Sequence, residues 1–152
     1  MDVKKAIYHY CSYQERSHAE ARNKLYELGC TTPEVEEHIS MLIETGLLNE
    51  ERYARAFARG KFRIKQWGKQ KIIQHLKQNR ISDYCIKKAL TEIDPDEYLQ
   101  TLNTLVGKKW EELKKDKNIH IRKGKLYRYL LQKGYSSGDI NESIALLLNA
   151  GK

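Results

Sequence analysis

The chain has 152 residues, of which 40% are hydrophobic and 32% charged, and its formal net charge is +8. This composition predicts a folded, strongly solvated protein with modest apolar cores. No apolar stretch approaches the roughly 18 residues that a membrane span requires, and the first residues lack the apolar core of a secretory signal. The three cysteines are widely separated, so we expect reduced thiols and a cytoplasmic protein.

Helix start and stop signals recur along the chain. Ser17 and Glu20 have the spacing of a capping box, and Thr32 stands as a cap before Pro33, which suits a first helical position. Similar starts are present at Asn49, Ser82, Asp94 and Ser136, and glycines suited to end a helix are Gly29, Gly46 and Gly134. Alternating strand patterns are absent, which predicts an all-α protein.

Nine helices are expected, over residues 3–14, 17–28, 33–45, 50–66, 69–79, 83–92, 95–115, 122–133 and 137–149. They group into three tandem three-helix units of the helix-turn-helix type, over residues 1–46, 47–93 and 94–152. Such an arrangement predicts an elongated, curved body. In the seventh helix, an apolar stripe at helical spacing predicts a buried face formed by Leu99, Leu102, Val106, Trp110 and Leu113.

One pattern of five apolar positions occurs three times, with anchor residues 51 and 54 positions apart. The copies are Ala21, Leu25, Cys30, Val35 and Ile39; Ile72, Leu76, Ile81, Ile86 and Leu90; and Leu126, Leu130, Tyr135, Ile140 and Ile144. Repeats of this period are typical of stacked supersecondary units, so we expect these positions to be buried.

Charge is distributed unevenly among the three units. Residues 1–51 hold 5 Lys and Arg against 10 Asp and Glu, whereas residues 52–90 hold 12 cations and the single acid Asp83. Residues 91–152 are nearly balanced, with 11 cations and 9 acids. Like charges without counterions cost stability, so the middle segment is expected to meet an anionic partner.

The motifs of catalysis are absent from the sequence. Gly60-Lys61 and Gly107-Lys108 lack the remaining residues of a phosphate-binding loop. The five histidines do not pair at metal-ligand spacing, and no two cysteines lie two to four residues apart. We therefore expect a protein that is not an enzyme, with no cofactor and no metal site.

The strongest candidate for a binding surface begins in the expected helix over residues 50–66. At about 100° per residue, four arginines fall on one stripe, and Tyr53, Phe57 and Ile64 fall on a face suited to burial. The stripe consists of Arg52, Arg55, Arg59 and Arg63. Arginine binds phosphates and carboxylates in a bidentate way, so we expect the last three to be exposed and to bind a partner.

Two further interpretations concern single residues of this segment. Arg52 is expected to cap or to pair locally, with Glu44 or Glu51. Among the aromatic residues of this segment, only Trp67 is a candidate for stacking on bases. The remaining basic residues of the expected surface are Lys61, Lys65, Lys69, Lys71, Lys77, Arg80, Lys87 and Lys88.

A continuous string in the chain resembles the signature of the RecX family. It reads Gly46-Leu47-Leu48-Asn49-Glu50-Glu51-Arg52-Tyr53-Ala54 and is followed by Phe57. Arg16-Ser17 with Glu20, and Trp67-Gly68 with Ile72 and Leu76, also match. The chain departs from the pattern where Asn49 replaces a usual Asp, Ala21 a usual Leu, and Arg80 a usual helix-ending Gly.

The resemblance implies a regulator of the RecA recombinase that lies in the groove of the RecA–DNA filament and limits filament growth, ATP hydrolysis and strand exchange. Its partners would be the RecA filament and single- or double-stranded DNA, contacted directly or through RecA, and we expect a monomer without membrane contact. Two alternatives stay open from the residues alone. One is a stand-alone helix-turn-helix-like DNA-binding protein, and the other is a helical scaffold that binds an acidic protein.

Overall fold

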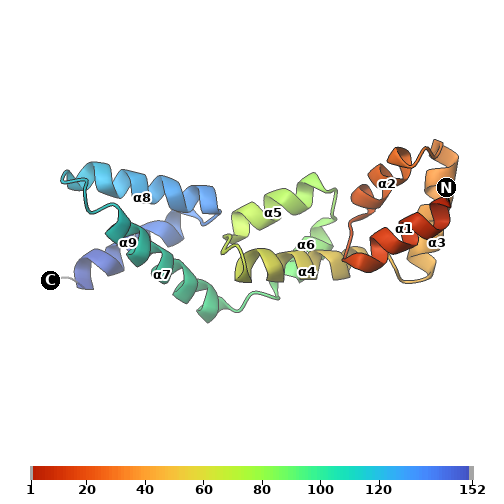
Figure 1. Ribbon diagram of the computed structural model, residues 1–152. Coiled ribbons are helices and arrows are strands. Elements are labelled where there is room, and N and C mark those ends of the chain that lie inside the picture. Colours follow the sequence, from red (N-terminus) through yellow and green to blue (C-terminus); the bar gives the residue numbers. More distant parts are fainter. Residues whose placement is uncertain (1, 151–152) are drawn as a thin grey trace. The chain divides into compact units, whose positions relative to one another are not determined.

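The computed structural model describes residues 2–150, and over that range the chain forms nine α-helices and no strand (Figure 1). The helices are α1 (Val3–Tyr13), α2 (His18–Glu27), α3 (Thr32–Glu44), α4 (Glu50–Arg63), α5 (Lys69–Gln78), α6 (Asp83–Leu90), α7 (Pro95–Glu112), α8 (Ile119–Lys133) and α9 (Ser137–Ala150). The expected all-α fold is confirmed, and the expected helix ends agree with the structure to within three residues. No helix among the described residues combines the length and the apolar character needed to cross a bilayer.

The helix caps follow the sequence signals, with one shift. The Ser17 N–H donates to the Glu20 carboxylate at 2.9 Å, and the Glu20 N–H donates to the Ser17 hydroxyl at 3.0 Å, so the expected capping box is present. The cap of α3 is Thr31 and not the expected Thr32. Its N–H and hydroxyl both donate to the Glu34 carboxylate, at 2.9 and 2.8 Å, and the helix therefore begins one residue earlier.

Left-handed backbone ends several helices. Gly29, Gly46 and Gly134 have φ values of 91°, 80° and 105°, as the stop signals predicted. Among residues 2–150, two residues other than glycine also adopt this region, Gln66 at 58° and Arg80 at 60°. The Gln66 conformation explains why α4 ends earlier than the sequence indicated, because a left-handed residue cannot continue the helix.

The chain forms two compact units. Unit 1 contains residues 2–58 and 75–92, and unit 2 contains residues 59–74 and 93–150. In unit 1, α2 packs against both α1 and α3 (Figure 1). Side chains from these helices and the following turn form a core of Ile7, Cys11, Ala21, Leu25, Val35, Ile39, Leu42 and Leu48. The division of the chain at residues 46 and 93 stays a prediction.

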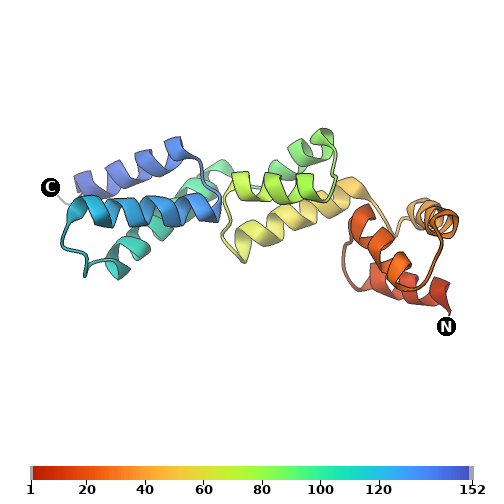
Figure 2. The same ribbon diagram turned by 90° about the horizontal axis from the view of Figure 1, so that it is seen from above.

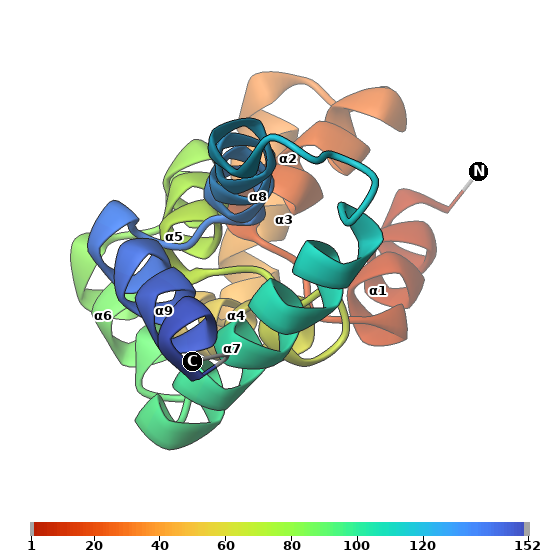
Figure 3. The same cartoon turned by 90° about the vertical axis from the view of Figure 1, so that its left-hand side faces the viewer.

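In unit 2, α7, α8 and α9 each contact the other two helices (Figures 2 and 3). Three buried aromatic rings lie close together in this unit. The Tyr98 centroid lies 5.7 Å from that of Phe62 and 5.2 Å from that of Tyr135. Burial raises the pKa of Tyr98 to about 12 and also raises the pKa of Tyr135, because both phenols lose water.

The repeated apolar pattern marks the core well. Of its fifteen positions all are buried except Cys30 and Leu90, which are half-buried. Two other expectations of burial are wrong. Ile64 is 79% exposed because α4 has already ended at Arg63, and Leu99 is 48% exposed because its neighbour Tyr98 occupies the core instead.

Candidate partner-binding surface

The turn between α3 and α4 is held by the residues of the family-like string. The N–H groups of Leu47 and Leu48 both donate to the Leu42 carbonyl, at 2.9 and 3.1 Å. The Asn49 side chain accepts a hydrogen bond from the Arg52 N–H at 2.9 Å, so asparagine keeps the helix cap in place of aspartate. These residues therefore set where α4 starts.

The apolar residues of the same string anchor α4 in unit 1. Tyr53 and Ala54 are buried, and Phe57 is half-buried. The Phe57 ring lies 5.9 Å from the Tyr53 ring and 6.4 Å from the His75 ring. Burial, and next the nearby Glu20 carboxylate, raises the pKa of Tyr53 because both disfavour the phenolate. These side chains serve the fold, as their spacing predicted.

Arg52 joins α4 to the loop between α1 and α2. Its Nε lies 2.7 Å from Glu15 Oε2, and its guanidinium also donates to the Gly46 carbonyl at 2.8 Å. The expected pairing with Glu44 or Glu51 is wrong, because Glu15 approaches from a segment 37 residues away in the sequence. With both contacts made inside unit 1, the head group of Arg52 has a structural role.

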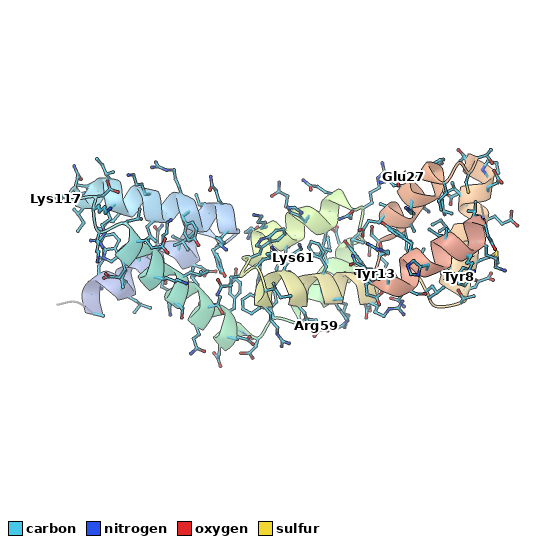
Figure 4. The ribbon with its side chains drawn as sticks, viewed as in Figure 1. Tyr8, Tyr13, Glu27, Arg59, Lys61 and Lys117 are labelled. Carbon is cyan, nitrogen blue, oxygen red and sulfur yellow. The ribbon has the colours of Figure 1, made fainter. Side chains whose placement is uncertain are left out.

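The other arginines of the stripe differ in their surroundings. Arg55 binds two carboxylates, those of Glu51 at 3.1 Å and Glu92 at 3.5 Å, and its side chain is only 31% exposed. The expectation that Arg55 is exposed is therefore wrong. It is also wrong for Arg59, which is half-buried, whereas Arg63 is exposed as expected. Figure 4 shows Arg59 and Lys61 on opposite sides of α4.

Within unit 2, lysines gather around aromatic rings. The ammonium groups of Lys61 and Lys71 lie 4.9 and 4.4 Å from the centroid of the Trp67 ring. The ammonium of Lys69 lies 4.8 Å from the centroid of Tyr98. Cations at these distances are attracted by the face of the ring. The structure thus brings three of the sequence-predicted basic residues together with aromatic side chains.

Lys133, at the end of α8, joins this group and was missed by sequence reasoning. Its ammonium donates to the Lys65 carbonyl at 3.0 Å, across 68 positions of sequence. Burial, then the charges of Lys71 and Lys65, lower the pKa of Lys133. No local signal in the sequence could have found this residue, because only the fold brings α8 to the start of α5.

The remaining predicted basic residues lie in unit 1. Lys77, Arg80 and Lys87 are exposed, and the Lys88 ammonium lies 5.5 Å from the centroid of the Tyr84 ring. Arg80 takes the left-handed conformation in the turn before α6, where the family pattern has a glycine. Among residues 2–150, no group of three histidine, cysteine or acidic side chains is arranged to hold a metal ion.

The fold and its charged residues define an all-α helical repeat protein with a basic middle segment. Two family models match the chain, described as the second three-helix domain of RecX over residues 49–90 and the third three-helix domain of RecX over residues 96–144. The regulatory protein RecX of Prosthecochloris aestuarii is 33% identical over 150 residues, which cover 97% of this chain and 96% of that protein. The chain belongs to the RecX family.

Other relatives agree with this assignment. The regulatory protein RecX of Clostridium perfringens is 32% identical over 135 residues, which cover 88% of this chain. The match spans 63% of that relative's length. The crystal structure of RecX from Lactobacillus salivarius superposes with a TM-score of 0.81 at 27% identity, covering 95% of this chain and 94% of that one. The curated relatives carry the name of regulatory proteins.

Proposed function

We propose that the protein is a non-enzymatic regulator that binds the filament of a RecA-type recombinase on DNA and limits its growth, ATP hydrolysis and strand exchange. The observation that carries the proposal is the similarity to regulatory proteins named RecX over nearly the whole chain. The basic middle segment supports it, because a filament of protein on DNA presents phosphates and carboxylates that lysine and arginine bind.

The surroundings of the basic residues support some of them over others as contacts of the partner. Arg52 and Arg55 already bind carboxylates inside unit 1. Arg63 and Lys65 are exposed and form none of the ion pairs found among residues 2–150. An exposed cation without an internal counterion can pair with an anionic group of a partner. We therefore assign the contact with the filament first to Arg63 and Lys65.

The test is the DNA-dependent ATP hydrolysis of a RecA-type recombinase from the same source. The unchanged protein, added below the recombinase concentration, should suppress hydrolysis. The double variant Arg63→Glu with Lys65→Glu should lose most of this effect while keeping its helical circular dichroism, because both side chains are exposed. Lys117→Glu is the matched control, since Lys117 is also exposed and lies in the turn between α7 and α8 (Figure 4).

Two outcomes would contradict the proposal. Unchanged ATP hydrolysis at equimolar protein would contradict the regulatory function. Equal suppression by the double variant and by the control would support the function but would show that Arg63 and Lys65 do not make the contact.

A stand-alone DNA-binding protein is the second candidate, favoured by the lysines around Trp67. It predicts DNA binding that weakens steeply with added salt, together with no effect on the recombinase at salt concentrations where DNA is not bound. Suppression of hydrolysis that persists at such salt concentrations would exclude it.

A further inference from the structure

The start of α5 and the end of α8 are locked together through their backbones. The Gly68 N–H donates to the Lys133 carbonyl at 2.7 Å, and the Gln70 N–H donates to the Gly134 carbonyl at 2.9 Å. A Cβ atom on Gly68 would lie 2.3 Å from the Gly134 carbonyl carbon, so the two segments touch where neither has a side chain. This contact fixes the positions from which the neighbouring lysines extend.

Three lysines collect at this contact. Lys65 lies before it, Lys71 lies in the first turn of α5, and Lys133 ends α8. None of the carboxylates among residues 2–150 forms an ion pair with them. The lowered pKa of Lys133 has burial as its first cause and the charges of Lys71 and Lys65 as the next, which agrees with a shared positive field.

The sequence around the contact increases this field. Residues 59–74 hold six cations and no acid. The first turn of α5 contains no acidic residue, although the positive end of the helix dipole favours one there. The protein therefore bears an electrostatic cost at this place that a bound anion would relieve.

An aromatic side chain beside the lysines indicates which anion fits. Trp67 is half-buried, with the Lys61 and Lys71 ammonium groups 4.9 and 4.4 Å from its ring centroid. A base that stacks on Trp67 would displace one ammonium group, which is then placed to meet the adjoining phosphate. The stacked base and the new contact between ammonium and phosphate together replace the lost cation–π contact.

The kind of cation is compatible with a phosphate backbone. The three residues at the contact are lysines, whose ammonium groups bind phosphates as compact point charges. Duplex DNA keeps its bases stacked on each other and offers none to Trp67. Single-stranded nucleic acid supplies both the phosphates and an unstacked base.

We propose that Lys65, Lys71 and Lys133 together with Trp67 form a binding site for single-stranded nucleic acid. Residues of two family domains contribute to it, Lys65, Trp67 and Lys71 from the matched segment 49–90 and Lys133 from the matched segment 96–144. The site deepens the proposed function, since it assigns a nucleic-acid partner to part of the same basic segment, and it rests on that function for its role.

The test uses the full chain with Trp110→Phe, so that Trp67 is the only tryptophan, because the chain has two. A short oligothymidylate should quench its fluorescence to saturation at low salt, without any recombinase. Lys133→Gln should weaken binding about five-fold at 0.1 M salt and reduce the slope of log K against log salt by about 0.7, the value for one phosphate contact on a single strand. Lys117→Gln is the control and should change neither quantity.

Several results would overturn the site. These are no quenching at low salt, equal effects of Lys133→Gln and Lys117→Gln, tighter binding of a duplex of the same length, or quenching by polyphosphate equal to that by the oligothymidylate. Lys65→Gln and Lys71→Gln repeat the test if Lys133→Gln loses its helical circular dichroism, because the Lys65 side chain is exposed.

The outcome can be separated from that of the proposed function. If the protein suppresses the recombinase but does not bind the oligonucleotide, the proposed binding site is wrong and the regulatory function stands. If it binds the oligonucleotide but leaves ATP hydrolysis unchanged, the regulatory function is wrong and the binding site stands.

Discussion

Replacing Gly68 by alanine tests the backbone contact between the start of α5 and the end of α8. The added Cβ would lie 2.3 Å from the Gly134 carbonyl carbon and 2.4 Å from the Tyr135 amide nitrogen. Non-bonded carbon atoms prefer about 3.5–4.0 Å, so the two segments must separate by about 1 Å. Backbone atoms cannot rotate away as the end of a side chain does. The hydrogen bonds from Gly68 to Lys133 and from Gln70 to Gly134 would therefore weaken or break.

The magnitude follows from these contacts. Two lost hydrogen bonds cost about 1 kcal/mol each, and overpacking adds about 1–3 kcal/mol. Alanine recovers about 0.4–1 kcal/mol because it restricts the unfolded chain more than glycine does. We therefore expect Gly68→Ala to lower the free energy of unfolding by about 2–4 kcal/mol.

Urea unfolding followed by circular dichroism measures this change, and Gly60→Ala is the matched control. Gly60 lies inside α4, and a Cβ there meets no atom within 4 Å. In an open helix position alanine is better than glycine by up to about 1 kcal/mol, so the control should be more stable than the unchanged chain. A Gly68→Ala protein as stable as the control would refute the reasoning.

Two further predictions concern single residues. Arg80→Gly should raise the free energy of unfolding by about 1 kcal/mol. The reason is that Arg80 has a φ of 60°, which costs a residue other than glycine about 1–2 kcal/mol. An unchanged or lower urea midpoint would contradict this prediction. The free energy of unfolding should fall as the pH rises from about 10 to about 12. Tyrosine has a pKa of about 10 in the unfolded chain and Tyr98 has a pKa of about 12 in the folded protein, so the folded state holds the Tyr98 phenol proton more tightly. Tyr98→Phe should show a shallower decline, measured by circular dichroism and tyrosinate absorbance, and an equal decline would argue against Tyr98 as a contributor.

Local signals in the sequence predict most of the fold. The caps at Ser17 and Asn49 each depend on a residue three positions further along, and the repeated apolar pattern depends on spacings of four to five residues. Such short-range patterns fix helix ends and the buried face, because helix geometry is regular. The all-α class and the helix positions therefore follow from residues that are close together in the chain.

Side-chain partners across long distances in the sequence could not be predicted. Arg52 and Glu15 are 37 positions apart, and Lys133 and Lys65 are 68 apart. Their pairing depends on how helices pack, which helical periodicity does not specify. The exposed Leu99 shows the same limit: adjacent residues Tyr98 and Leu99 lie about 100° apart on α7, and the rings of Phe62 and Tyr135 decide which of them enters the core.

The candidate surface was found from the sequence only as a set of charges. The basic segment after residue 52 is plain from composition, but the arginine stripe did not reveal that Arg52 and Arg55 are held by internal carboxylates. A stripe on a helix gives the direction of each side chain and not the acids that approach it from other helices.

The first amides of α5 have an unusual dependence on later parts of the chain. The Lys69 N–H donates to the Tyr98 hydroxyl at 2.9 Å, and the amides on either side of it donate to carbonyls at the end of α8. A ribosome makes the N-terminal part first, so α5 is synthesised before the carbonyls at the end of α8 that accept from its amides. The lysine cluster beside it therefore takes shape only after α8 has been made, and a nascent chain halted before α8 carries the charges of this region without their final arrangement.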